Sequence, residues 1–421
     1  MTTEHPESAT RRPLVVYFHR YPPEIEAVQY PAMRLLMDRL LENYDVLYVS
    51  MRGRKPIDPA VRQGLRVLEI PLRVDQTSAA DKWIKMMLYY VFLPWTLWRL
   101  KKEHPSLVLC KEILPFVPLT VSRLGMTTVI AANDWWWSIY FGGTTIGQKM
   151  AKWLESFEVR RWSRAGAYVI VNTEAEKRLV MGRGMRADHI HVINAPYRPG
   201  LFGPCDASEE RKKLGFGEGL WTVAIHGIIR PGKGYGQLLE WWRDVTRVHA
   251  NWRLLVIGGA GGESWFRGRM KRLGLEPYVV MTGWLPTKQD VNRHLNAADC
   301  LLVVRRNSED NAGLIPSALN NSMATGKPTV ATGLPGMAEL VEHGKSGYLF
   351  EPDNYASFLA ALEHVAAHPE EAKQVGVAGM KRAQECFDPD RAARMHVEMI
   401  DEILGRRSTE TGAAAPSPRR E

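Results

Sequence analysis

Residues Asn307–Pro328 read NSEDNAGLIPSALNNSMATGKP, and this stretch predicts a ligand-facing corner of an α/β domain. The apolar run Cys300–Val304 before it is typical of a buried strand in a parallel sheet, and the carboxyl ends of such strands are where these sheets bind ligands. Ser317–Ala324 is predicted to form a helix whose unpaired amino-terminal N–H groups suit a phosphate. Gly326 then ends the helix, and Thr329–Thr332 returns to an extended segment.

Apolar runs separated by helical patterns repeat along the rest of the chain. The runs predicted as strands are Pro13–His19, Val46–Met51, Leu65–Ile70, Leu107–Cys110, Thr127–Ala132, Ala167–Val171, His189–Ile193, Trp221–Ile225, Leu254–Gly259 and Met281–Gly283. This alternation predicts parallel sheets covered by helices. Because 421 residues exceed what one core usually organises, we expect two α/β domains.

The segment Asn194–Cys205, NAPYRPGLFGPC, is rich in proline and glycine and lacks periodicity, which suits a hinge between domains. We therefore expect a first α/β domain over residues 13–200 and a second over residues 201–384. A further helical pattern occupies residues 385–405. Low apolar content predicts disorder at both ends of the chain, over residues 1–12 and 406–421.

The formal charge of +9 is compatible with nucleic acid, anionic lipid or a phosphorylated substrate as a partner. The sequence contains no helix-turn-helix or zinc-finger pattern and its basic residues are dispersed, so we expect no nucleic-acid partner. Tryptophans beside basic residues favour an anionic membrane surface. The apolar segment Trp83–Trp98 is too short to span a bilayer and contains Lys85 and Pro94, which predicts a surface-seeking domain helix.

Cysteine spacing and the first residues bear on the compartment. The four cysteines are widely scattered, without the paired spacing of a zinc or redox site, and we expect no metal site. The first dozen residues, MTTEHPESATRR, lack the apolar core of a secretory signal. These features predict a cytoplasmic protein, peripheral on the inner face of the cell membrane.

Three stretches of the second half together resemble the family 4 glycosyltransferases of the GT-B fold. Met323–Thr332, MATGKPTVAT, is similar to the end of that family's signature, S-x-x-E-G-F-G-L-V-x-x-E-A-M-A-x-G-x-P-V-V-A-T. Gly333–Asp353 continues the resemblance, and His226–Trp242, HGIIRPGKGYGQLLEWW, looks like the family's diphosphate loop. The resemblance implies two Rossmann-like parallel-sheet domains facing a central cleft. It also implies that the helix at 385–405 returns to the first domain.

The loop after Trp221–Ile225 carries the residues expected to bind the donor diphosphate. Two cations there can meet a pyrophosphate, lysine as a point charge and arginine as a fork, while Gly227 lets backbone come near. The family pattern reads G-R-x-x-x-x-K-G, so Lys233 matches it and Arg230 sits two residues late. The resemblance implies that Lys233 and Arg230 stabilise charge on the departing diphosphate.

The donor-sugar residues depend on how the signature is aligned. When Gly313 and Leu314 are matched to the family's G-L, the glutamate that touches the donor sugar aligns on Asp310, with Glu309 as the alternative. The glutamate that grips the ribose aligns on Asn321, so the family's E-x7-E pair is absent as written. An asparagine can still hydrogen-bond a ribose hydroxyl.

Two more donor-side candidates carry alternative interpretations. Trp284, in MTGWLP, lies where the family seats the nucleotide base, and it either stacks on a base or packs inside the domain. Glu339 matches a family acid on the donor side of the cleft, or it caps a following helix.

The acceptor side is predicted at the ends of first-domain strands. Asn133 and Asp134 stand where the family commonly has His-Asp. Asp134 is either the general base of an inverting transferase or a turn or cap residue, whereas a retaining enzyme needs no such base. His19 and Arg20 follow the first strand, in the region of the acceptor mouth, and a structural role for His19 is the alternative.

These observations predict a hexosyltransferase with no cofactor, which uses a UDP- or GDP-hexose as donor. The acceptor is expected to be a glycan, a lipid-linked sugar or a small hydroxylated compound, in bacterial surface-polysaccharide or glycoconjugate synthesis. The alternatives are a sugar-nucleotide epimerase of the same fold and a degenerate nucleotide-sugar-binding domain without catalysis.

Overall fold

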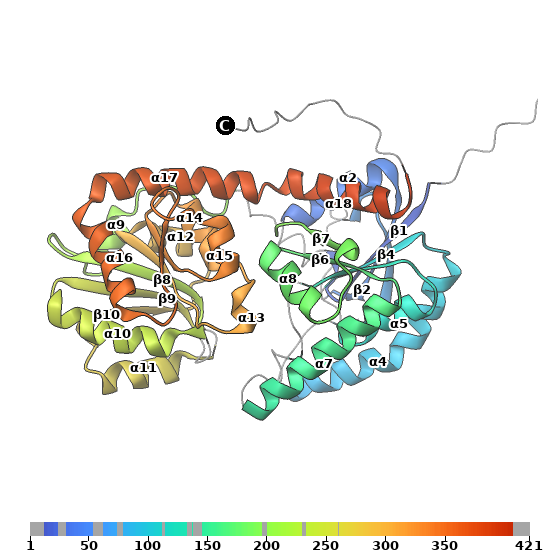
Figure 1. Ribbon diagram of the computed structural model, residues 1–421, viewed down its shortest axis with the longest axis horizontal. Helices are drawn as coiled ribbons and strands as arrows, with labels where there is room; N and C mark the ends of the chain where they lie inside the picture. The colour runs from blue at the N-terminus through green and yellow to red at the C-terminus, as the bar shows by residue number, and fades with distance from the viewer. Residues whose placement is uncertain are drawn as a thin grey trace, which may run out of the picture.

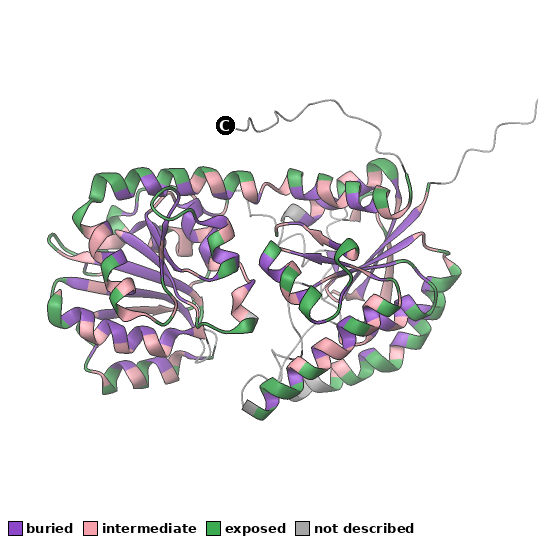
Figure 2. Ribbon diagram, in the orientation of Figure 1, coloured by how far each residue is buried: buried purple, intermediate pink, exposed green. Residues whose placement is uncertain are grey.

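The computed structural model describes residues 12–23, 31–53, 62–73, 79–111, 114–132, 137, 145–195, 200–229, 233–259 and 261–406. Two α/β domains lie side by side, and the last two helices, α17 (Pro369–Cys386) and α18 (Pro389–Ile403), run along both of them (Figure 1). Buried residues follow the strands of both sheets, and exposed residues follow the outer faces of the helices (Figure 2).

The first domain is built on a parallel sheet of seven strands in the order β3-β2-β1-β4-β5-β6-β7. The strands are β1 (Leu14–His19), β2 (Asp45–Arg52), β3 (Arg66–Arg73), β4 (Leu107–Lys111), β5 (Thr128–Ala131), β6 (Tyr168–Val171) and β7 (Ile190–Val192). Its helices are α2 (Pro31–Asn43), α4 (Ala79–Lys102), α5 (Val117–Arg123), α7 (Thr145–Arg164), α8 (Glu174–Gly182) and the 3-10 turn Ala187–His189. All seven strands coincide with predicted apolar runs to within a few residues.

The second domain is built on a parallel sheet of six strands in the order β10-β9-β8-β11-β12-β13. The strands are β8 (Trp221–Ile228), β9 (Trp252–Gly259), β10 (Val279–Gly283), β11 (Cys300–Val303), β12 (Thr329–Thr332) and β13 (Tyr348–Phe350). Its helices are α9 (Ser208–Lys213), α10 (Tyr235–Val248), α11 (Glu263–Arg272), α12 (Lys288–Asn296), α13 (Glu309–Ala312), α14 (Ser317–Ala324), α15 (Pro335–Leu340), α16 (Tyr355–Ala367) and α17. The predicted fold class, two Rossmann-like parallel-sheet domains, is confirmed.

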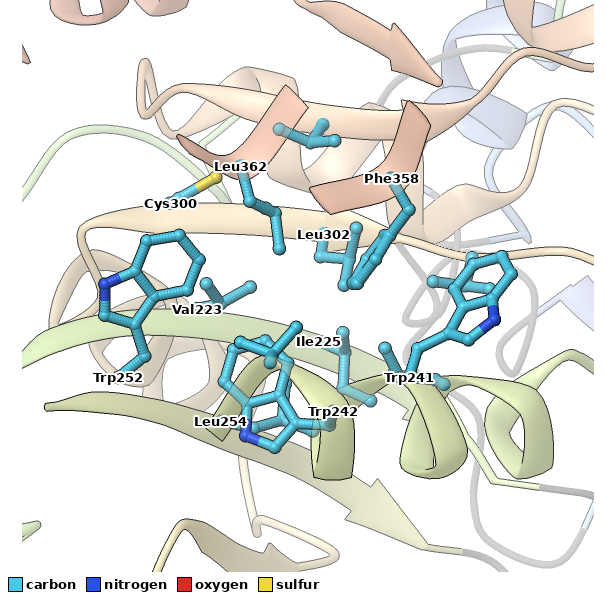
Figure 3. Close-up of a cluster of buried hydrophobic side chains, with 14 of the residues drawn as sticks. Val223, Ile225, Trp241, Trp242, Trp252, Leu254, Cys300, Leu302, Phe358 and Leu362 are labelled. Atoms are coloured by element: carbon cyan, nitrogen blue, oxygen red, sulfur yellow. The ribbon is translucent and has the colours of Figure 1, made fainter. Parts of the chain in front are cut away.

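A tryptophan-rich core fills one face of the second sheet. Trp241 and Trp242 of α10 pack with Phe358 of α16 over the apolar side chains of β8, β9 and β11 (Figure 3). Trp242 is fully buried. The opposite face is covered by α12, α14 and α15, whose buried leucines and methionines contact Leu301 and the strands beside it. Both faces of the sheet are therefore apolar, as expected of a parallel sheet between helices.

The terminal helix pair connects the domains. α17 continues to Cys386, two residues past the expected end of the second domain at 384, and it packs on α14. α18 packs against α2, and its Ala393 and Ile400 are buried in the first-domain core. Arg39 of α2 also bonds Asp390 of α18, with a 2.9 Å contact between Nη2 and Oδ1. The last helix thus belongs to the first domain by its packing.

Candidate donor site and domain boundary

The strand order of the second sheet places a ligand site at a defined point. β8 is flanked by β9 on one side and by β11 on the other, so the chain connections diverge between the carboxyl ends of β8 and β11. Ligands of doubly wound sheets bind at such a switch point. A pocket of about 120 Å³ opens at this edge. It is lined by Phe202, His226, Gly227, Ile257, Gly258, Trp284, Leu285, Pro286, Thr287, Lys288, Val291 and Asn321.

Two facing glycines shape the floor of the pocket. Gly227 of β8 and Gly258 of β9 are register partners, and both have positive φ angles. A Cβ atom added at Gly258 would lie 2.1 Å from the carbonyl oxygen of Gly227. A side chain at Gly258 would therefore disrupt the strand pair, whereas one at Gly227 would meet no atom within 4 Å and is disfavoured only by the positive φ. Backbone therefore lines this part of the pocket.

His226 places a neutral imidazole in the pocket wall. It is buried, and burial, reinforced by the positive charges of Lys288 and Arg305, lowers its pKa to about 3. Its Nε2 lies 3.4 Å from Nδ2 of Asn321 in α14. Among the described residues, Nδ1 of His226 has no hydrogen-bond partner. The pocket thus offers an amide and an uncharged imidazole to a polar ligand, in a positive field.

Trp284 lies at the mouth of the pocket, on the loop between β10 and α12. Its side chain is 59% exposed, which excludes the alternative of packing inside the domain. Thr287 fixes the end of the loop, because it forms a capping box with Asp290 at the start of α12. The ammonium of Lys288 lies 5.8 Å from the centroid of the Trp284 ring. An aromatic face beside a cation is therefore held open to solvent.

Lys233 immediately precedes the amino terminus of α10, which follows the carboxyl end of β8. Gly234, the N-cap residue, has a φ of 92°, and an added Cβ would lie 3.0 Å from a methyl carbon of Val304 and 3.5 Å from the backbone of Arg305. The first turn of α10 therefore approaches the end of β11 closely. Lys233 is half-buried there, while Arg230 lies outside the described residues.

Sequence reasoning missed two residues of this region. His226 sits near the end of the apolar run TVAIHG, and Arg305 follows β11 after one intervening residue, Val304. Arg305 interacts with the Tyr235 hydroxyl and lies close enough to His226 to lower its pKa. Both could have been predicted as site residues, because each is a polar residue near the carboxyl end of a buried strand.

The structure places three of the predicted donor residues at the boundary with the first domain. Both carboxylate oxygens of Glu339 accept hydrogen bonds from backbone N–H groups at the start of α8, Oε2 from Glu174 at 2.8 Å and Oε1 from Ala175 at 2.7 Å. The carbonyl of Gly313 accepts a bond of 2.7 Å from the Thr173 hydroxyl. Glu339 therefore caps a helix of the other domain, not a helix that follows it in the chain.

Gly313 allows this contact. A Cβ atom added there would lie 2.6 Å from Cγ and 2.9 Å from the backbone nitrogen of Glu176. The backbone at Gly313 is thus approached closely by α8. Leu314, which follows Gly313, is half-buried.

Glu309 is the third boundary residue. Its carboxylate accepts a hydrogen bond of 2.7 Å from Nζ of Lys152 in α7 and lies 3.9 Å from the guanidinium of Arg183. The bond from Lys152 holds the pKa of Glu309 below its ordinary value. Asp310 belongs to α13 with Glu309, but its side chain lies outside the described residues.

Of the residues predicted on the acceptor side, the structure describes two and leaves two outside the described residues. His19 ends β1 and is fully buried, with its Nδ1 accepting a bond of 3.2 Å from the backbone N–H of Tyr21 and lying 3.3 Å from Oη of Tyr48. The guanidinium of Arg20 stacks on the Tyr21 ring at 4.5 Å. These contacts give His19 a structural role. Asn133 and Asp134 lie outside the described residues.

Comparison with known proteins defines the class. Residues 206–382 match the family model described as glycosyl transferases group 1. With the two parallel-sheet domains and the glycosyltransferases among its relatives, this match shows that the chain is a glycosyltransferase of the GT-B type. In the part of the chain that the structure describes, no three histidine, cysteine or acidic residues cluster as metal ligands. No helix in that part has the length and apolar character needed to cross a bilayer.

Relatives and solved structures are similar over different extents. An uncharacterized glycosyltransferase of Haemophilus influenzae is 23% identical over 78% of this chain and 83% of its own length. The amylovoran biosynthesis glycosyltransferase AmsK of Erwinia amylovora is 26% identical over 41% of this chain, which spans 42% of that protein. The crystal structure of Anabaena HepE with UDP and glucose superposes with a TM-score of 0.67 at 16% identity, covering 92% of this chain and 99% of HepE.

Proposed function

We propose that this protein transfers a hexose from a nucleoside diphosphate sugar, bound by the second domain, to a hydroxyl group of an acceptor bound by the first. The observation that carries the proposal is the pocket at the switch point of the second sheet, which combines an exposed aromatic ring, buried polar groups and a positive field. The likeness of the fold to a structure that holds UDP and glucose supports a nucleotide sugar as donor. Membership of family 4, within the GT-B type, is part of the same proposal.

Each donor residue takes a role that its position suits. The base stacks on Trp284, and the ribose hydroxyls meet Asn321 and His226. The diphosphate lies over Gly227 toward Lys233 and the free N–H groups of α10, with Arg230 and Arg305 as further cations. Glu309 or Asp310 faces the sugar, beside the contacts that Gly313 and Glu339 make at the domain boundary, with Leu314 next to Gly313 in the chain.

In this scheme lysine and arginine side chains, in place of a metal ion, stabilise the negative charge that develops on the departing diphosphate. The bond between the anomeric carbon and the diphosphate oxygen breaks, and a bond to the acceptor oxygen forms. With retention, the acceptor proton passes to the departing diphosphate. With inversion, it passes to Asp134 as general base. Retention is the course we favour, since it requires no residue beyond the donor site.

We place the acceptor among glycans and lipid-linked sugars of bacterial surface-polysaccharide synthesis. A relative named for amylovoran biosynthesis supports this class. The same proposal includes a cytoplasmic location, peripheral on the inner face of the cell membrane. His19 supports the acceptor region through its fixed position at the end of β1, and Arg20 follows it in the chain. Asn133, which lies outside the described residues, is proposed for the same region on its place in the sequence.

Calorimetric titration with UDP, GDP, ADP and dTDP tests the proposal. We expect selective micromolar binding of one nucleotide and a loss of at least roughly tenfold in affinity for Lys233→Ala, which removes a phosphate cation, and for Trp284→Ala, which removes a stacking face. Lys212→Ala, on an exposed helix of the same domain, is the matched control and should bind as the wild type does.

Two results would reject the transferase. The absence of binding by all four nucleotides would favour a degenerate domain. Conversion of a nucleotide sugar to its epimer without any acceptor would favour the epimerase.

A further inference from the structure

Helix α4 of the first domain exposes a continuous apolar stripe. Its outward side chains recur at the spacing of one helix face and are Ile84, Met87, Leu88, Val91, Trp95 and Trp98. The opposite face, with Tyr89, Leu93 and Leu97, is buried in the domain core. The helix is therefore apolar on both sides, and its outer stripe is larger than the scattered apolar residues of an ordinary surface.

Helix α7 carries a second stripe of the same kind. Ile146, Met150 and Trp153 are exposed at the spacing of one helix face. The Trp153 ring stacks on Phe157 with 5.8 Å between centroids, and the guanidinium of Arg161 lies 4.8 Å from the Phe157 ring. An aromatic surface bordered by a cation thus continues along α7.

The two helices flank one short segment of chain. The Tyr90 hydroxyl of α4 donates to the carbonyl of Pro115 at 2.9 Å. The next residue, Phe116, donates its backbone N–H to Glu158 of α7 at 2.7 Å. Figure 1 draws α4 and α7 on the same side of the first sheet, away from α2 and α18. We call the exposed sides of these two helices the α4–α7 face.

The described side chains of both helices carry charge of one sign toward solvent. Among their described side chains the only acids are Glu155 and Glu158, and both are buried. The basic side chains are Lys85, Arg99, Lys101, Lys102, Lys149, Lys152, Arg160, Arg161 and Arg164. The ammonium of Lys102 lies 3.7 Å from the centroid of the Trp98 ring, at the end of the α4 stripe. The face therefore combines tryptophan, aliphatic and basic side chains.

We infer that the α4–α7 face docks on an anionic lipid bilayer. Tryptophan and aliphatic side chains enter the interfacial region, while lysine and arginine reach the headgroup phosphates. Each basic residue near such a surface adds to the electrostatic attraction. A protein partner fits less well, because lysine is depleted in protein–protein interfaces, whereas lysines lie along both stripes here and two more end α4.

The position of the face also concerns the acceptor, in a step that rests on the proposed function. Lys152 of α7 bonds Glu309 of the second domain, so α7 passes from the lipid-facing surface to the domain boundary. Trp153, the next residue, is exposed. An acceptor anchored in the bilayer would therefore be presented beside the donor-sugar residues, which makes a lipid-linked sugar the acceptor class that this geometry suits.

Vesicle sedimentation of the full-length protein tests the docking. We expect binding to vesicles of equal parts phosphatidylcholine and phosphatidylglycerol, little binding to phosphatidylcholine alone, and release by high salt. Val91→Glu should reduce the partition coefficient at least roughly fivefold, because it puts a charge in the apolar stripe. Val248→Glu is the matched control, since Val248 of the second domain is 63% exposed and Val91 is 69% exposed.

A second variant tests the charges separately. Lys101→Glu combined with Lys102→Glu should lower binding to the anionic vesicles by roughly tenfold or more. Wild-type thermal stability and nucleotide binding in each variant establish that folding and the donor site are intact. Nucleotide binding without any vesicle binding would overturn the docking and leave the proposed function standing, whereas vesicle binding without nucleotide binding would do the reverse. A wild-type dimer that Val91→Glu converts to a monomer, with no vesicle binding, would assign the face to self-association and refute the lipid.

Discussion

Replacement of Glu339 by glutamine should loosen the contact between the two domains. The wild-type carboxylate accepts two backbone N–H bonds, of 2.7 and 2.8 Å, at the start of α8. A hydrogen bond to a charged group contributes about 1.5–3 kcal/mol, and glutamine retains one neutral acceptor while turning an N–H group toward the other donor. Because the Glu339 side chain is 31% exposed, we expect the free energy of the contact between the two domains to fall by roughly 1–2 kcal/mol.

Hydrogen exchange followed by mass spectrometry measures this loss at its source. The amides of Glu174 and Ala175 should exchange roughly 5- to 30-fold faster in Glu339→Gln, which is the population change that 1–2 kcal/mol produces. Glu103→Gln is a matched control, because Glu103 is also 31% exposed and pairs with Arg66 inside the first domain. Unchanged exchange in α8, or equal acceleration in the control, would refute the interdomain cap.

Two further expectations concern stability. Gly313→Ala should lower the free energy of unfolding in urea by roughly 1–3 kcal/mol, because the new methyl group would lie 2.6 Å from Glu176. Gly217→Ala is the control and should change little, because no atom lies within 4 Å of the added methyl group. Equal effects of the two substitutions would contradict a clash at Gly313. Thermal stability should fall as the pH drops from about 6.5 toward 4, because burial lowers the pKa of His226 to about 3 and of His396 to about 4, so the unfolded chain binds more protons. His396→Gln should weaken this dependence on pH, so that the acid-induced loss in the free energy of unfolding is smaller by roughly 1–2 kcal/mol at about pH 5. The same dependence on pH in this variant as in the wild type would exclude His396 as a source.

The strands could be predicted because each is a short apolar run bounded by polar residues. Cys300–Val303 and Thr329–Thr332 are examples, and their order along the chain also indicated the parallel sheets. β13 was not predicted as a strand, since Tyr348–Phe350 is only three residues long and follows a turn-rich segment, whereas the equally short β7 lies within the longer predicted run His189–Ile193. A pattern so short has no readable period.

The meeting of Gly227, Trp284 and Asn321 in one pocket was predictable for the same reason that the fold was. Gly227 lies near the end of β8, Trp284 on the loop between β10 and α12, and Asn321 in α14, and they meet because parallel strands end at one edge of the sheet. Glu309, Gly313 and Glu339 have contacts 157, 140 and 165 residues away in the sequence. Local spacing contains no information about such partners, so only the assembled domains reveal them.

The chain crosses between the domains at two places. It leaves the first core at Ile193 and enters the second at Phe202, and it returns where buried Phe387 ends α17 and Asp388 caps α18. The line through the two crossings is the hinge axis about which one domain can rotate most freely relative to the other. Opening should therefore be a swing that parts the α8 contacts while the helix pair α17–α18 bends only at its junction.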